Sequence, residues 1–346
     1  MRLALTILLL SLQGLAELSF SSNARTFETQ HSSIVVKGLA HSCLTIMTIP
    51  DGLPCNPAYT PLNKKPSLGI EILLSNGYSS LENLRSLLSN KINQELADTL
   101  FSKGKILQIE SNIDINFRSK YLNGQYSPMT VKGFSVVRNE ANPDVDLYAV
   151  EEKGFSFQSG YEITDNFYTG AQVRLVNRKF IRRQFKLVSL GTQAGADYLK
   201  PKEQTATYFE PAASWIIAEA WKPRISLLVA NLGTISENHD ELKTPVEPQV
   251  GFGFSPPVMW GDLDISLEYR SMTYEESNFD KLHIGSLYRF GSMYLTGGID
   301  ANGISSGVYY SLDKINAGIM YSTTRFVNDN EDFFTQTVYM QLGWQI

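Results

Sequence analysis

Residues 264–270, which read DISLEYR, decide the fold class of this chain. Side chains of an extended strand alternate between two faces, so Ile265, Leu267 and Tyr269 share one face and the polar residues share the other. A soluble sheet turns its apolar face towards a core. A membrane barrel turns its apolar face towards lipid and its polar face towards a lumen. The fold therefore depends on which of these two solvents the apolar face meets.

Similar alternation recurs from Ser67 to Ile346, and no long apolar run follows the first residues. The last strand alternates up to the final residue, as in the C-terminal signal that barrel-assembly machinery recognises, although Ile346 replaces the usual Phe or Trp. Fourteen strands are predicted. The first begins at Leu68, and the others lie near 105–118, 124–138, 145–163, 166–177, 207–218, 223–233, 247–256, 262–271, 281–290, 293–300, 304–312, 315–324 and 334–346.

The predicted connections alternate in length. They are short after even-numbered strands, as at Gly261-Asp262, and mostly long after odd-numbered strands, as from Arg178 to Ala206. Short periplasmic turns and long outer loops are typical of bacterial outer-membrane barrels, which have even strand numbers. We therefore predict an all-β fold, a fourteen-stranded antiparallel transmembrane β-barrel in the outer membrane of a Gram-negative bacterium.

The N-terminus predicts export. Arg2, an apolar run over residues 3–12 and the small residues Gly14 and Ala16 indicate a signal peptide over residues 1–16. The run is too short to span a bilayer of roughly 30 Å. Export to an oxidising compartment favours a disulfide between Cys43 and Cys55 over two unpaired thiols.

Two further segments differ from the strands. Residues 17–66 contain five prolines after position 49 and read as an irregular N-terminal segment. Leucine and isoleucine at spacings of three and four predict one amphipathic helix over 79–102, in the first outer loop. This helix could pack on a loop, lie on the membrane surface or cap an opening.

Bulk composition supports the membrane interpretation. Charged residues make up 19% of the chain, and 17 Tyr and 18 Phe suit interfacial aromatic girdles. A Tyr-rich soluble β-protein is the alternative. The net charge of −5 suggests no nucleic-acid partner.

Short motifs add a family resemblance. Cys55-Asn56-Pro57-Ala58 precedes the first strand and Gly38-Leu39-Ala40 lies upstream. Together they resemble the opening of the long-chain fatty-acid outer-membrane transporter (FadL-like) superfamily, with Asn56, Pro57 and Ala58 as the hatch motif. The stretches 261–270, 282–290 and 307–312 resemble its TraF-like and PorV-like branches. The resemblance implies a barrel over 67–346, with residues 17–66 folded inside it as a hatch.

The polar faces predict the lining of the lumen. With the apolar faces towards lipid, charges of both signs point inwards, which favours pairing around a plug over a substrate path. An ion-selective open pore would show one dominant sign. The predicted lumen-lining residues are Glu71, Glu110, Asp114, Glu162, Arg174, Asp264, Glu268, Arg270 and Arg289.

A basic segment in a predicted outer loop, residues 178–186, is the candidate ligand site. Its basic groups alternate with apolar ones and could bind an amphipathic carboxylate or lipopolysaccharide phosphates, or form an ordinary solvated face. The candidate ligand-binding residues are Arg178, Lys179, Arg182, Arg183 and Phe185.

The resulting function is binding or transport of small hydrophobic, fatty-acid-like compounds across the outer membrane. The alternative is a non-transporting scaffold attached to a secretion or conjugation apparatus. No enzyme is predicted, because His283 and Ser286 should face opposite sides. No cofactor or metal site is predicted, because the sequence has no Gly-rich phosphate loop and no Cys/His metal spacing. Expected partners are outer-membrane lipid, lipopolysaccharide, a hydrophobic ligand and the barrel-assembly machinery.

Overall fold

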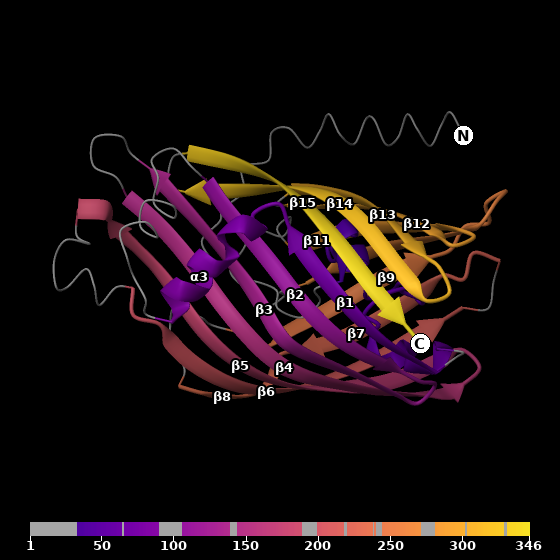
Figure 1. Cartoon of the computed structure of the whole chain (residues 1–346). Coiled ribbons are helices and arrows are strands. Elements are labelled where there is room, and N and C mark those ends of the chain that lie inside the picture. Colours follow the sequence, from indigo (N-terminus) through magenta and orange to yellow (C-terminus); the bar gives the residue numbers. More distant parts are fainter. Residues whose placement is uncertain are drawn as a thin grey trace.

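The computed structural model describes residues 33–63, 66–89, 106–138, 144–188, 199–217, 220–237, 239, 244–270, 281–301, 303–328 and 331–346. Strands wind around a common axis to form a barrel (Figure 1). The strands are β1 (Ser67–Ser75), β2 (Ile106–Arg118), β3 (Leu122–Arg138), β4 (Asp144–Thr164), β5 (Phe167–Lys186), β6 (Lys202–Ile216), β7 (Arg224–Ala230), β8 (Leu232–Ser236), β9 (Glu247–Phe254), β10 (Asp262–Tyr269), β11 (Leu282–Phe290), β12 (Met293–Asp300), β13 (Gly303–Ser311), β14 (Ile315–Asn328) and β15 (Glu331–Gln345).

The barrel is closed and antiparallel. Sequential neighbours pair from β1 to β6, β1 pairs with β15, and the β5–β6 ladder closes the ring. β7 and β8 both pair with β6 and are separated only by Asn231, so they share one wall position. The described residues thus form fourteen wall positions, which confirms the predicted fold.

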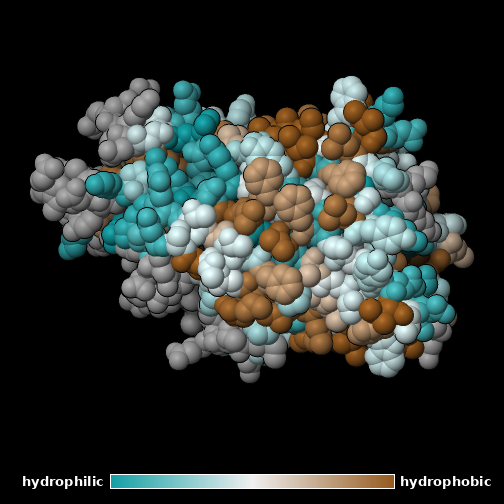
Figure 2. Space-filling model, turned by 90° about the horizontal axis from the view of Figure 1, so that it is seen from below, coloured by the Kyte–Doolittle hydropathy of each residue, from teal (hydrophilic) through white to brown (hydrophobic). Residues whose placement is uncertain are grey.

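The wall follows the sequence alternation. In β10, Ser266 and Glu268 are fully buried, whereas Leu267 between them is 39% exposed. In β15, Met340, Leu342 and Trp344 alternate with the buried Gln341 in the same way. Figure 2 shows apolar surface over much of the middle of the barrel, a large hydrophilic area towards one end and smaller hydrophilic areas towards the other. The apolar side chains therefore face outwards, as a lipid-facing wall requires.

The wall is taller on one side than the sequence predicts. β5 continues to Lys186 and β6 begins at Lys202, so the predicted long loop from 178 to 206 is wrong. Alternation persists through this basic segment, and residues 178–180 pair with 202–204 on β6. β3 to β5 have 17 to 21 residues, whereas β10 and β12 have eight. The taller side projects at the end opposite the C-terminus (Figure 1).

Helices are few among the described residues. The predicted helix over 79–102 is described only in its first part, as η3 (Tyr78–Ser80) and α3 (Leu81–Leu88), because residues 90–105 lie outside the described residues. α3 crosses the outer face of β2 to β4 (Figure 1). There Leu84, Leu87 and Leu88 join one apolar cluster with Val131 and Leu147. No helix in the described ranges is long and apolar enough to cross a bilayer.

The N-terminal segment lies inside the ring. α2 (Ile34–Gly38) begins at Ser33, whose hydroxyl accepts a hydrogen bond from Val36 N. The 3-10 helix η2 (Pro57–Leu62) ends the segment. We call residues 33–63 the plug. The predicted signal peptide, residues 1–16, lies outside the described residues.

Candidate functional site: the plugged lumen

The plug fills the lumen at the level of the apolar wall. Of its residues only Thr48 is exposed. Ile34, Val36 and Leu39 pack against the inward-facing wall residues Tyr309 and Met320 in one apolar cluster. Burying each such side chain contributes about 1.5–3 kcal/mol, so apolar contact as well as polar contact holds the plug in place.

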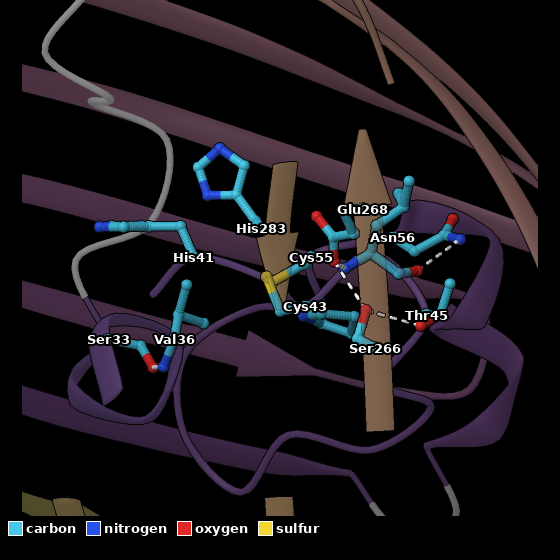
Figure 3. Close-up of a disulfide and its surroundings, with 12 residues drawn as sticks. Ser33, Val36, His41, Cys43, Thr45, Cys55, Asn56, Ser266, Glu268 and His283 are labelled. Carbon is cyan, nitrogen blue, oxygen red and sulfur yellow. Dashed lines mark hydrogen bonds between the residues drawn. A yellow bond between two sulfur atoms is a disulfide. The ribbon is translucent and has the colours of Figure 1, made fainter. Parts of the chain in front are cut away.

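A disulfide fixes the centre of the plug. Cys43 and Cys55 are bonded, with their Cα atoms 5.8 Å apart. The next residue, Asn56, accepts a hydrogen bond from Ala58 N at 3.0 Å and donates one to Leu44 O at 3.1 Å. Asn56 thereby caps η2, and Pro57 occupies the first helical position, where no N–H is needed. The Asn-Pro-Ala element is thus a helix start tied to the disulfide loop (Figure 3).

Glu268 on β10 anchors this loop to the wall. Its carboxylate accepts hydrogen bonds from Leu44 N and, at 2.9 Å, from the hydroxyl of Ser266. Ser266 in turn accepts from Thr45 Oγ1 at 2.7 Å, and the Arg270 guanidinium pairs with Glu268 at 2.7 Å. Figure 3 shows Glu268 and Ser266 directed towards the disulfide loop. A fully buried carboxylate is thus paired and hydrogen-bonded, as burial demands.

Arg224 at the start of β7 makes a second anchor. Its side chain is fully buried. It donates to Thr45 O and to Ser255 Oγ, and it pairs with Asp264 at 2.8 Å. One guanidinium therefore joins the plug to β10 and to the turn after β9.

Two acidic wall residues bind the plug at separate points. Glu110 pairs with Lys37 of α2 at 2.8 Å and with Lys132 of β3 at 3.4 Å. Glu71 accepts from Gly52 N at 3.2 Å and from Asn116 Nδ2 at 3.0 Å. Each carboxylate thus receives one partner from the plug and one from the wall, two lysines at Glu110 and two amide donors at Glu71.

Asp51 of the plug accepts hydrogen bonds from one plug residue and one wall residue. Ser33 Oγ donates to it at 2.8 Å, and Gln341 Nε2 of β15 donates at 3.0 Å. Burial raises the pKa of the Asp51 carboxyl above its ordinary value, although both hydrogen bonds and the charge of Arg118 oppose the rise. The two donors therefore offset part of the cost of burying this group.

Glycines on the inner wall let the plug backbone approach closely. A Cβ atom at Gly298 of β12 would lie 2.2 Å from Leu39 C, and one at Gly170 of β5 would lie 2.5 Å from Pro57 O. Both distances are far below van der Waals contact. The plug therefore fits a wall surface that larger residues would block.

A break interrupts the wall above the plug. Asn231 has a positive φ of 59°, and the ladder between β7 and β9 ends at Ala230. The inward-facing Arg174 pairs with Glu210 at 2.8 Å and donates to Asn231 Oδ1 at 2.8 Å. Glu210 also accepts from Asn231 N at 3.1 Å. The break is thus held from the lumen by a buried ion pair.

Aromatic and charged groups line the taller side of the lumen. The rings of Phe134 and Tyr148 stack with centroids 5.9 Å apart, and Phe180 joins them in one cluster. Arg178 pairs with Glu152 and donates to Tyr208 Oη at 3.2 Å. This side of the lumen therefore combines apolar rings with a compensated cation.

The predicted lumen-lining residues fall into two groups. Glu71, Glu110, Asp114, Arg174, Glu268 and Arg270 are buried inside the barrel, and Asp264 is partly buried beside Arg224. Glu162 and Arg289 lie near the short turns and are exposed. The structure thus brings seven of the nine around the plug or the wall break.

The candidate ligand-binding residues lie in strand β5, so their predicted place in a loop is wrong. They also do not form one patch, because a strand alternates faces. Arg178 is buried in the lumen, Phe185 is buried with the α3 cluster, and Lys179 pairs with Glu203 on the outer face. Arg182 and Arg183 are partly buried, on opposite faces of the same strand.

Four further charged wall residues belong to the candidate site and are absent from the predicted lining. They follow the same inward alternation of the strands, which therefore also predicts their place: Arg224, Lys132, Glu152 and Glu210. Asp51 was not predictable, because the plug has no periodicity.

The histidine in β11 has a structural partner. His283 Nδ1 lies 3.0 Å from Ala40 O of the plug, and Ser286 Oγ donates to Gly297 O on β12. In the described ranges no three His, Cys, Asp or Glu side chains gather as metal ligands would.

Comparisons with known proteins address the fold. No protein-family model and no curated protein sequence matches the chain. The toluene transporter TbuX of Ralstonia pickettii is similar over 92% of this chain and 99% of its own, with a TM-score of 0.53 and 11% identity. The CymD monoaromatic hydrocarbon channel is similar over 90% and 96%, with a TM-score of 0.51 and 10% identity.

A third solved structure, a Pseudomonas aeruginosa FadL homologue, is similar over 94% of this chain and 99% of its own, with a TM-score of 0.50 and 10% identity. The predicted resemblance to TraF-like and PorV-like branches stays a prediction. The chain has the fold of the FadL-like outer-membrane barrels, as its sequence resemblance predicts.

Proposed function

We propose that the chain is an outer-membrane channel for small hydrophobic compounds, in which the plug controls passage. The observation that carries this proposal is a plug fitted into the lumen of an apolar-walled barrel. The similar solved structures include a toluene transporter and a monoaromatic hydrocarbon channel, which favours this function over a scaffold role. Small aromatic hydrocarbons and fatty acids are accordingly the proposed ligand classes.

The wall break offers a lateral route past the plug. β8 pairs with β6, and β9 pairs with β7 and β10, while no β8–β9 ladder forms among the described residues. A hydrophobic compound leaving here would enter the membrane, where its partition is favourable. We propose that the Arg174–Glu210 pair maintains the backbone geometry of the break at Asn231.

The stacked rings above the plug form a proposed contact for a ligand once the packing around them opens. Phe134, Tyr148 and Phe180 supply apolar rings, of which Tyr148 and Phe180 are fully buried, and Arg178 adds a polar end close to them. Aromatic faces favour offset stacking with planar ligands. The other four candidate ligand-binding residues lie in the same strand, β5, but do not form one patch with these rings. They are Lys179, Arg182, Arg183 and Phe185.

The membrane partners follow from the outer surface. Lys153 and Lys179 lie on the lipid-side face of β4 and β5, above the apolar wall, where lipopolysaccharide phosphates could accept their hydrogen bonds. The C-terminal strand is the proposed signal for barrel-assembly machinery. Residues 1–16 are proposed as signal peptide, 17–66 as hatch and 67–346 as barrel.

Uptake by whole cells tests the function, because lipopolysaccharide slows the entry of hydrophobic compounds. Cells lacking their own hydrocarbon channel would express the chain and receive labelled toluene or labelled laurate. The proposal predicts a faster initial rate than in cells with an empty vector. Equal rates for both compounds, with folded barrel present in the outer membrane, would remove the transport function.

A further inference from the structure

Three of the four tryptophans of the chain gather at one flank of the short-turn end. Trp215 is the penultimate residue of β6, Trp221 lies in the β6–β7 turn, and Trp260 lies in the β9–β10 turn. They are 53%, 55% and 69% exposed, and Met259 beside Trp260 is 86% exposed. A cluster of large apolar groups this open requires an apolar partner.

Contacts between the two turns hold the cluster in shape. Ser255 N donates to Trp221 O at 2.7 Å, and the rings of Trp221 and Phe254 stack with centroids 6.2 Å apart. The hydroxyl of Tyr288 on β11 donates to Trp260 O. The exposed tryptophans are thus presented by a tied pair of turns.

The β9–β10 turn differs from the other short turns. It runs from Ser255 to Gly261 and reads SPPVMWG, whereas the turns at 165–166, 291–292 and 312–314 are shorter and mostly polar and read DN, GS and LDK. Polar turns suit an aqueous periplasm. An apolar turn of seven residues does not, and it reaches beyond the hydrogen-bonded wall.

The apolar surface of the turns continues into the lipid-facing wall. Ile225 and Leu227 of β7 and Phe252 of β9 are 43%, 54% and 45% exposed, directly along the strands from the two turns. The flanking Lys222 is exposed and lies beside Trp221, where a lipid phosphate would accept its hydrogen bonds. Tryptophan prefers this boundary between acyl chains and headgroups.

We propose that residues 255–261, with Trp215 and Trp221, bind phospholipid of the periplasmic leaflet. The cluster anchors the β6–β10 flank of the barrel in the membrane and sets its depth there. This proposal requires that the apolar face of the strands contacts lipid. It does not depend on the proposed transport function.

Single-tryptophan proteins in liposomes provide the test. Each would keep Trp260 or Trp344 and carry Phe at the other three positions, with heat modifiability on gels as the check of folding. Trp344 is the matched control, because it is 60% exposed on the outer face of β15. Brominated phospholipid should quench Trp260 at least as strongly as Trp344. Quenching of Trp260 by aqueous iodide but not by brominated lipid would overturn the proposal and indicate a periplasmic protein partner instead.

Labelling at Met259 gives a second, independent readout. In the described residues both cysteines are in the disulfide, so Met259→Cys adds one reactive thiol. A charged maleimide should label this thiol much more slowly in liposomes than in detergent. Ser292→Cys, in an exposed polar turn, is the control and should react at similar rates in liposomes and in detergent. Similar rates for Met259→Cys in the two media would contradict the proposed contact between this turn and lipid.

Discussion

At the scale of single residues, Asn56 joins two parts of the plug that the chain alone would leave separate. Its side-chain oxygen caps η2 and its amide reaches Leu44 O. Such a double contact accounts for Asn at this position, because Asp lacks the donor and Ser is too short.

Asn56→Ala should therefore speed amide exchange across residues 44–58, with a cost near that of a lost helix cap, about 0.5–2 kcal/mol. Asn56→Ser keeps a cap oxygen and should cost less. Hydrogen–deuterium exchange with mass spectrometry measures both variants. Equal protection in wild type and Asn56→Ala would show that the cap does not hold the plug.

Arg224 carries the largest single-residue effect that we expect. Arg224→Met leaves Asp264 without its cation and Thr45 O without this donor, and breaking a buried ion pair on one side costs about 3–5 kcal/mol. The temperature at which the barrel loses heat modifiability should fall clearly. Arg289→Met, at an exposed position, is the control and should leave this temperature nearly unchanged. Matching temperatures for the two variants would refute the anchor role.

At the scale of elements, loss of the disulfide should raise amide exchange in the plug without raising it in the wall strands. Replacing both Cys43 and Cys55 by Ala removes a cross-link whose loop closure contributes about 3 kcal/mol for a loop of this size. Exchange should rise in the plug, while amides in the β10–β11 ladder stay protected. If the ladder exchanged as fast as the plug, the two would unfold as one unit.

How far the elements could be predicted from sequence depends on periodicity. Alternation such as Ile265, Leu267 and Tyr269 identified the strands and their outward faces. It did not reveal the length of β5, because basic residues at 178–186 suggested a loop although they alternate faces like any strand. The plug was predictable only through the resemblance of residues 55–58, since its anchors Asp51 and Thr45 follow no pattern that links them to β15 or β10.

At the scale of the whole molecule, the outer surface of the barrel contacts lipid, where a charged side chain is unfavourable. Leu342→Arg places a cation at a position that is 65% exposed on the outer face of β15. A cation on the lipid-facing side costs about 2–4 kcal/mol at the bilayer midplane. The yield of folded barrel in membranes should fall, whereas Ser292→Arg in a polar turn should assemble normally. Normal assembly of Leu342→Arg would place that face in water.

A reversible lock on the plug tests the central claim, that the plug controls hydrophobic passage. Gly38 of α2 faces Thr296 of β12, and a Cβ at position 38 would lie 2.9 Å from Thr296 Cβ. Gly38→Cys with Thr296→Cys therefore allows a disulfide after an outward shift of about 0.6 Å or more, since bonded cysteines have Cβ atoms about 3.5–4.5 Å apart.

The measurement is the initial rate of labelled toluene uptake by cells that carry this double variant. Peptide mapping would confirm the new disulfide and the intact Cys43–Cys55 pair, and each single variant serves as a control. If the plug controls passage, uptake should be slow while the lock is closed and should recover after a mild reductant opens it. Uptake by the locked variant at the wild-type rate would contradict the plug's control of passage.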